Sequence, residues 1–221
     1  MVDLSRRTRQ IQHLPPADLR GFPARTYRAG TRLWRAARKT PWWYCSRGDC
    51  RFDLVEPFGT CYLGTDELTG ILEVIGPELD NGVVAAEFLD ARRLFSFTLR
   101  SPARGADLAS RRATGFGATN ELSTMTPYTV PRAWARAFHE WGFAAICYRT
   151  RFDTSEPARG VAHFGRSGEA RRARGKALAI DAAMRRRLER ECNIEVAPAP
   201  TMSDLEIAPD PQPRTRDRAT S

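Results

Sequence analysis

The chain lacks any long hydrophobic run. None of its 221 residues belongs to an apolar stretch that approaches the roughly 18 residues of a membrane-spanning helix. The first thirty residues are rich in arginine and interrupted by Pro15, Pro16 and Pro23, so they offer no apolar segment of the kind that export signals contain. These absences argue against a membrane protein and an exported one, and the expected location is the cytoplasm.

Cysteine is scarce and odd in number: the chain has five, at positions 45, 50, 61, 147 and 192. An odd count without an export signal is typical of free thiols rather than of a disulfide framework. Cys45 and Cys50 lie close enough in sequence to be two metal ligands, but no matching pair follows at zinc-ribbon spacing. No metal is therefore expected.

Lysine is almost absent, with only Lys39 and Lys176, although the net charge is +9 and the sequence pI is about 9.9. Arginine supplies nearly all of the positive charge. Such a balance admits nucleic acid, an acidic protein or an anionic metabolite as a partner. A genome biased towards G and C produces the same preference for arginine, so the bias by itself indicates no function.

The pattern predicts an α+β fold in one domain with flanking segments. We expect a poorly ordered or loosely docked arm at 1–24, a folded central domain at 25–166, a basic C-terminal helix at 167–195 and a disordered tail at 196–221. The tail is rich in Pro, Asp, Thr and Ser, which cannot bury enough apolar surface to fold. The expected helix holds the basic residues Arg171, Arg172, Arg174, Lys176, Arg185, Arg186 and Arg187.

Within the domain, alternating or continuous apolar runs predict strands at 60–63, 83–88, 94–99, 143–148 and 161–164. A helix is expected after Thr65 as N-cap, with Asp66 and Glu67 in its first turn and its end at Gly76. A second helix is expected from about Pro131 to Gly142. The segment 100–128 has a loop composition.

Two stretches far apart in the chain, 33–76 and 146–152, hold the groups that suit one ligand. They supply the guanidinium groups of Arg35 and Arg51, the phenol of Tyr62, the carboxylate of Glu73 and the hydroxyl of Thr150. That set fits a ligand with a diphosphate, a ribose and an aromatic base. Glu73 lies off the apolar stripe of its helix, in the last turn, where the helix dipole disfavours a carboxylate. An exposed surface position and a position in a cleft both explain it.

These landmarks, in this order, resemble the RES domain, a family named for an Arg, a Glu and a Ser. The resemblance covers roughly residues 26–165. Its matches are Arg35, Arg51-Phe52, Tyr62-Leu63, Glu73 and Tyr148-x-Thr150. Thr150 departs from the family, because it keeps the hydroxyl of the family Ser and adds a methyl group that tightens the pocket.

The resemblance implies a mixed-sheet fold like that of ADP-ribosyltransferases and an activity that degrades NAD⁺. It implies catalytic roles for Glu73, Arg35 and Thr150, and binding roles for Arg35 and for Arg51, Tyr62 and Tyr148. Several members of the family are toxins that an Xre-type helix-turn-helix antitoxin silences. An antitoxin of that type is therefore an expected partner beside NAD⁺.

The chemistry of these residues agrees with that activity. Cleavage of the nicotinamide–ribose bond leaves a cation-like sugar, as in glycoside hydrolysis. Glu73 is suited to accept from a ribose hydroxyl and stabilise the developing charge. Arg35 is suited to bind the diphosphate through its guanidinium fork, with Arg51 beside it. Tyr62 is then expected to stack on the nicotinamide, and Thr150 to bind the ribose or the amide.

Other functions remain open from the sequence. ADP-ribose can pass to water, to phosphate or to a protein, and a protein ADP-ribosyltransferase is the first alternative. Many such enzymes carry an acidic residue two positions before the catalytic Glu, where this chain has Ile71. The second alternative is a nucleic-acid-binding protein that uses the basic run at 171–187. The aromatic residues cluster in the other half of the chain, which disfavours that function.

Overall fold

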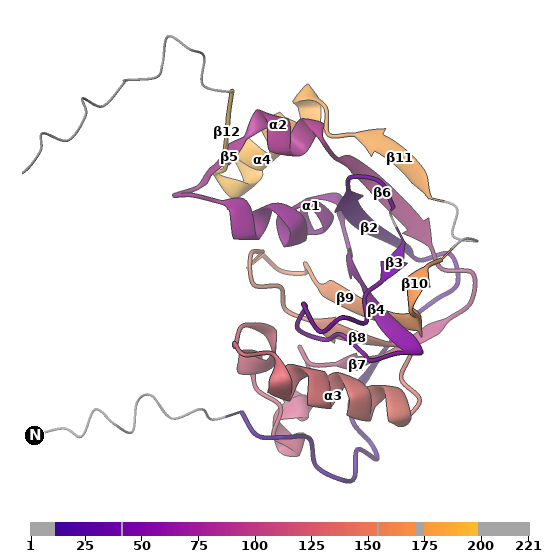
Figure 1. Cartoon of the computed structure of the whole chain (residues 1–221). Helices are drawn as coiled ribbons and strands as arrows, with labels where there is room; N and C mark the ends of the chain where they lie inside the picture. Colours follow the sequence, from indigo (N-terminus) through magenta and orange to yellow (C-terminus); the bar gives the residue numbers. More distant parts are fainter. Residues whose placement is uncertain (1–11, 41, 154, 171–174, 199–221) are drawn as a thin grey trace, which may run out of the picture.

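The computed structural model describes residues 12–40, 42–153, 155–170 and 175–198, and these form an α+β fold around one large mixed sheet (Figure 1). The sheet has eight strands in the order β1-β7-β8-β9-β4-β2-β6-β11. Only β7 and β8 run parallel in it. The strands are β1 (Ala24–Tyr27), β2 (Arg32–Ala37), β4 (Phe58–Gly64), β6 (Arg93–Thr98), β7 (Ala103–Asp107), β8 (Ala145–Tyr148), β9 (Gly160–Arg166) and β11 (Lys176–Ala179).

The remaining strands form two small sheets. β3 (Trp43–Tyr44) pairs with β10 (Gly168–Glu169), and β5 (Val83–Ala85) pairs in parallel with β12 (Glu195–Ala197). The α+β class and the large mixed sheet that the sequence predicts are confirmed.

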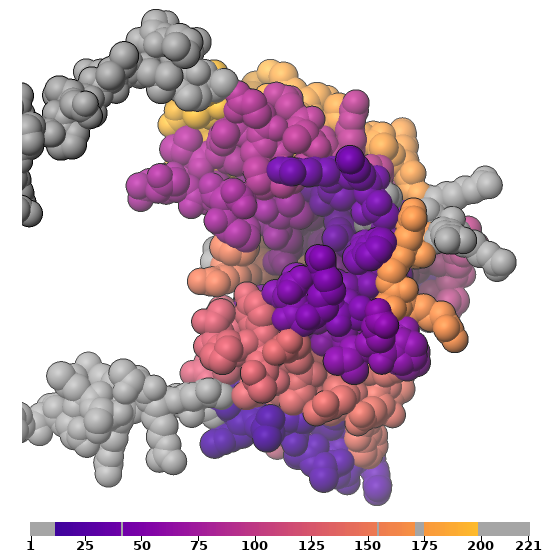
Figure 2. Space-filling model, in the orientation of Figure 1, coloured from indigo at the N-terminus to yellow at the C-terminus, as the bar shows by residue number. Residues whose placement is uncertain are grey.

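The large sheet is almost divided in the middle. β4 pairs with β9 along its whole length, and β2 pairs with β6 along its whole length, but β2 meets β4 only at Trp34 and Gly64. One half is therefore β1-β7-β8-β9-β4 and the other is β2-β6-β11. In Figure 2 the surface is indented between the magenta residues of one half and the salmon residues of the other.

Each half carries its own helices (Figure 1). The helices α1 (Glu67–Ile75), α2 (Ala86–Asp90) and α4 (Ala182–Cys192) pack with the β2 half around buried residues such as Leu94 and Leu188. The helix α3 (Thr129–Glu140) packs on the other half, around Trp134 and Phe138. A third core cluster, with Leu33 of β2 and Leu63 of β4, joins the two halves. Short 3₁₀ helices lie at Gly76–Glu78, Arg111–Phe116 and Asn120–Ser123. None of the described helices is long and apolar enough to cross a membrane.

α1 follows the predicted apolar stripe, and Ile71, Leu72 and Ile75 are buried. Its N-cap is Asp66, one residue later than predicted, because the Asp66 carboxylate accepts the backbone N–H of Thr69 at 2.9 Å. The helix lies very close to the sheet at Gly64 and Gly70. A Cβ at Gly64 would stand 2.4 Å from the nitrogen of Gly70, so only glycine allows this approach.

The N-terminal arm is docked more firmly than the sequence suggests. From residue 12 onward it packs along α3, where Leu19 and Phe22 are buried in the core. The ring of Phe22 lies 4.7 Å from that of Phe138. The prediction of a loose arm gave weight to its prolines and arginines and missed these two apolar side chains. Residues 1–11 lie outside the described part of the chain.

The basic segment is also different from its prediction. β10 and β11 occupy residues that were expected to be helical, and the helix α4 begins only at Ala182, after the N-cap Asp181. β11 joins the edge of the large sheet beside β6, and this tertiary pairing overrides the local composition. Residues 171–174 lie outside the described part. β12 falls at the start of the expected tail, and the tail from 199 onward also lies outside it.

Two further segments were predicted incorrectly. The strand expected at 83–88 ends at Ala85, where α2 begins. The loop expected at 100–128 contains β7, whose sequence of Ala, Arg, Gly and Asp has little strand character. β7 forms because β1 and β8 pair with it on both sides. The strands at 60–63, 94–99, 143–148 and 161–164 are confirmed with small shifts at their ends.

Candidate active site

A cavity of about 590 Å³ opens where β2 and β4 part. Arg35 comes from β2, Tyr62 from β4, Glu73 from α1, and Arg51 from the turn between β3 and β4; all four line this cavity. A larger cavity of about 760 Å³ lies between residues 46–58 and α3, and none of these four residues lines it. The first cavity is therefore the candidate site, because the chemically matched side chains converge there.

Glu73 stands in the cavity wall with one fixed partner. The hydroxyl of Tyr148, on β8, donates to Glu73 Oε2 at 3.0 Å. Burial raises the pKa of Glu73, and Asp153 adds to the rise, while the Tyr148 hydrogen bond and the charge of Arg51 oppose it. Burial and the nearby Glu73 charge also raise the pKa of Tyr148 well above its usual range, so the phenol stays protonated as a donor.

The ring of Tyr148 reaches Glu73 because its neighbour on β9 is glycine. Tyr148 pairs in register with Gly160, and a Cβ at Gly160 would stand 2.3 Å from the Tyr148 ring. Tyr148 is itself buried and lies behind the cavity wall rather than lining it. Its contact with a ligand would therefore be indirect, through Glu73.

The two arginines are held in different ways. Arg35 Nη1 donates to the carbonyl oxygen of Trp43 at 3.3 Å and to Cys61 Sγ at 3.1 Å, which leaves Nε and Nη2 for a ligand. Arg51 lies with its guanidinium carbon 5.4 Å from the ring centre of Tyr128. Its Nε is buried and has no hydrogen-bond partner among the described residues. An unpaired buried donor of this kind is ready to bind an anion.

Tyr62 offers the cavity its ring and not its hydroxyl. That hydroxyl accepts the backbone N–H of Phe52 at 2.8 Å and donates to Asp53 Oδ1 at 2.9 Å. Burial raises the pKa of Tyr62 well above its usual range, and the Asp53 charge adds to the rise. The phenol is therefore a neutral donor to Asp53, and it is not free to act as an acid.

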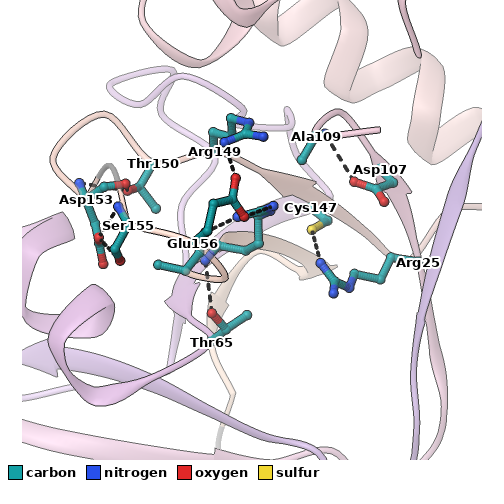
Figure 3. A network of polar contacts seen from close by, with 12 residues as sticks. Arg25, Thr65, Asp107, Ala109, Cys147, Arg149, Thr150, Asp153, Ser155 and Glu156 are labelled. Atoms are coloured by element: carbon teal, nitrogen blue, oxygen red, sulfur yellow. Dashed lines mark hydrogen bonds and ion pairs between the residues drawn. The ribbon is translucent and has the colours of Figure 1, made fainter. Parts of the chain in front are cut away.

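Thr150 is not in the cavity. Its hydroxyl donates to the carbonyl oxygen of Asp153 and accepts the backbone N–H of the same residue, both at 2.9 Å (Figure 3). The side chain is nearly buried and closes the turn at 150–153. Arg151 and Phe152 on that turn do line the cavity. The structure thus places the Thr150 hydroxyl as a support for the cavity wall, where the sequence suggested a direct contact.

Sequence reasoning missed three aromatic residues of the cavity, Trp34, Tyr128 and Phe152. Trp34 and Phe152 stand next to residues that the motifs singled out, so their neighbourhood was a usable signal. Tyr128 comes from a segment with a loop composition, and that segment gave no signal of a site residue. The three rings and Tyr62 make the cavity suitable for a flat aromatic group, beside arginines suitable for phosphate.

The fold and the cavity together define an α+β domain with one cavity lined by arginines and aromatic rings. The sequence profile of the RES domain matches residues 25–185, and the chain belongs to the RES domain family. No significant match is found among curated protein sequences.

Among solved structures the chain is similar to one from the MbcT–MbcA toxin–antitoxin complex of M. tuberculosis. The two chains share 13% identity with a TM-score of 0.50, and the match covers 70% of this chain and 87% of that one. At this identity the likeness shows the fold.

Proposed function

We propose that this cavity binds NAD⁺ and that the protein cleaves the bond between nicotinamide and ribose, passing ADP-ribose to water or to phosphate. The observation that carries the proposal is the placement of Glu73, fixed by Tyr148, in the same cavity as Arg35 and Arg51. One carboxylate for a cation-like sugar and two guanidinium groups for a diphosphate are what this reaction requires.

In this reaction Glu73 stabilises the positive charge that develops on the ribose and accepts from a ribose hydroxyl. Nicotinamide leaves as a neutral base, so the site needs no acid to protonate it. Arg35 and Arg51 hold the diphosphate, and their fixed positions reduce the entropy that the transition state costs. The ring of Tyr62 stacks on the nicotinamide. Thr150 supports the wall from behind through Asp153.

Membership in the RES family and the fold shared with a chain of a toxin–antitoxin complex support a toxin that acts in the cytoplasm and is paired with an antitoxin. For that antitoxin the Xre type is the one we propose. The net charge of +9 agrees with an acidic partner surface.

Two observations weigh against the alternatives. The residue two positions before Glu73 is Ile71, which is fully buried in the core. α1 therefore lacks the second carboxylate that many arginine-modifying transferases carry at that position. In α4, Arg185 pairs with Asp90, and Arg187 pairs with both Glu67 and Glu191. These ion pairs neutralise part of the basic surface that nucleic-acid binding would use.

The test is incubation of the purified protein with NAD⁺, with and without inorganic phosphate, followed by analysis of the products. We expect free nicotinamide in both cases. ADP-ribose alone identifies water as the acceptor, and a phosphorylated ADP-ribose that appears only with phosphate identifies phosphate. A third incubation with labelled NAD⁺ and cell extract detects transfer to protein. Intact NAD⁺ in all three would refute the proposal.

Replacement of Tyr148 by Phe should move the pH profile of NAD⁺ turnover. The Tyr148 hydrogen bond lowers the pKa of Glu73 against the effect of burial, so its loss raises that pKa further. Glu73 acts as a carboxylate, and turnover falls as pH drops through its pKa. The acid limb of the profile should therefore shift to higher pH.

The matched control for this measurement is Tyr27→Phe, which removes the hydroxyl of another buried tyrosine outside the cavity. Its profile should coincide with that of the unmodified protein. An unshifted acid limb in Tyr148→Phe would separate Glu73 from the titration that limits turnover.

A further inference from the structure

We propose that Asp53 is a positioning residue for Arg51 and fixes the turn from which Arg51 reaches the cavity. The proposal rests on the function proposed above, in which Arg51 binds the diphosphate. Asp53 is almost completely buried, with 2% of its surface exposed. Among the described residues it forms no ion pair, and no other Asp or Glu has so little of its surface exposed. Burial of a carboxylate without a cationic partner destabilises the fold, so the presence of Asp53 at this position needs an explanation.

The reason lies in the hydrogen bonds around the turn. Asp53 Oδ2 accepts the backbone N–H of Cys50 at 3.0 Å, and Asp53 Oδ1 accepts the hydroxyl of Tyr62 at 2.9 Å. The Tyr62 hydroxyl in turn accepts the backbone N–H of Phe52 at 2.8 Å. Asp53 thus binds the residue before Arg51 directly and the residue after Arg51 through Tyr62.

A second anchor comes from the same face of β4. The hydroxyl of Thr60, two residues before Tyr62, donates to the carbonyl oxygen of Phe52 at 2.7 Å. The same hydroxyl accepts the backbone N–H of Leu54 at 3.3 Å. Side chains two apart on a strand point to one face, so Thr60 and Tyr62 hold the turn together against the sheet.

Arg51 depends on these anchors because its own side chain has few. No hydrogen bond or ion pair of its guanidinium is found among the described residues, and its Nε is buried without a partner. The ring of Tyr128 is its neighbour on one side. The backbone on either side of Arg51 is therefore what places the guanidinium. A displacement of about 1 Å at a binding group can cost on the order of 10²-fold in rate.

Asp53→Asn is the sharpest single change, because it keeps the shape and removes one acceptor. Both oxygens of Asp53 accept hydrogen bonds, and an amide has only one oxygen. Either the N–H of Cys50 or the O–H of Tyr62 must then lose its acceptor. The turn that carries Arg51 should then loosen, although the cavity keeps every side chain that lines it.

The experiment is a double-mutant cycle of Asp53→Asn and Arg51→Ala, read as KM and kcat for NAD⁺ and as affinity for ADP-ribose. We expect Arg51→Ala to weaken binding about 10- to 100-fold, and Asp53→Asn to weaken it several-fold to tenfold with a smaller change in kcat. In the Arg51→Ala background, Asp53→Asn should add less than about twofold, because the residue it positions is already gone.

Additive losses in the double variant, or a fall in kcat without a rise in KM, would show that Asp53 acts only on the fold and would overturn the proposal. If Arg51→Ala itself left NAD⁺ binding unchanged, the function proposed for this cavity would fail first, and the positioning role with it. If Arg51→Ala acts and Asp53→Asn alone does not, only the positioning role fails.

Two further variants serve as a control and as a substitute. Asp181→Asn makes the same chemical change at a carboxylate that accepts a backbone N–H at the start of α4, away from the cavity, and should leave both kinetic constants unchanged. If Asp53→Asn does not fold, Tyr62→Phe replaces it in the cycle, since it breaks the same chain of hydrogen bonds and keeps the ring. Tyr62→Phe is read in the same way: a loss that is less than additive with Arg51→Ala supports the proposal, and additive losses overturn it.

Discussion

Glu73→Gln is expected to reduce NAD⁺ turnover about 10²–10³-fold, the usual loss when a group that stabilises developing charge is removed. The substitution keeps the shape of the side chain and still offers Tyr148 an oxygen acceptor, so it removes little besides the charge. Turnover is measured by release of nicotinamide. A variant that consumes NAD⁺ at the unmodified rate would remove Glu73 from the mechanism.

The same substitution should leave the fold as stable or make it more stable. The pKa of Glu73 is raised in the folded protein, so the folded state binds the proton more tightly than the unfolded state does. Between the ordinary pKa of a glutamate and the raised value, stability therefore falls as pH rises. Gln removes this penalty. The melting temperature of Glu73→Gln should exceed that of the unmodified protein above that pH range. The difference should vanish below the ordinary pKa of a glutamate.

Glu67→Gln is the matched control, because it makes the same change in the same helix outside the candidate cavity. It removes a partly exposed ion pair with Arg187, and such an ion pair contributes little to the stability of the fold. We expect normal turnover from it. Opposite effects of Glu73→Gln on turnover and stability, with neither effect in Glu67→Gln, would separate a catalytic carboxylate from a structural one.

Local signals predicted three of the elements around the site, but not the strand β2 that carries Arg35. The apolar stripe of α1 and the runs of β4 and β8 are strong patterns, and each element lies where it was expected. β7 was missed because its pairing with β1 and β8 outweighs a sequence without strand character. The arm was misjudged for a similar reason, since Leu19 and Phe22 find their core only in three dimensions.

The site was predictable to the extent that the chain itself brings its parts together. Arg35, Arg51, Tyr62 and Glu73 lie on consecutive elements, and the folded chain places all four around one cavity. Thr150 was assigned a ligand contact because a hydroxyl in a motif does not reveal its partner, and here the backbone of Asp153 engages it. The separation of β2 from β4, which creates the cavity, has no signal in either strand.

Arg35→Lys is expected to weaken NAD⁺ binding by about 1.5–3 kcal/mol, the contribution of a hydrogen bond to a charged group, or roughly 10- to 100-fold in Kd. Arg35 Nη1 is bound to Trp43 and Cys61, which aligns the fork and leaves its other nitrogens for a diphosphate. Lysine carries its three donors on one nitrogen and lacks the planar fork that faces two phosphate oxygens side by side. The fold should change little, because the charge and the stem remain.

Calorimetric titration of NAD⁺ in the Glu73→Gln background measures this loss, because the ligand is then consumed slowly. Arg93→Lys is the control, an exposed arginine on the neighbouring strand β6 outside the cavity, and it should bind NAD⁺ as before. Weaker binding in Arg35→Lys alone assigns the diphosphate to the fork of Arg35. Equal affinity in both variants would mean that the guanidinium serves the contacts with Trp43 and Cys61 and that Arg51 binds the phosphates without it.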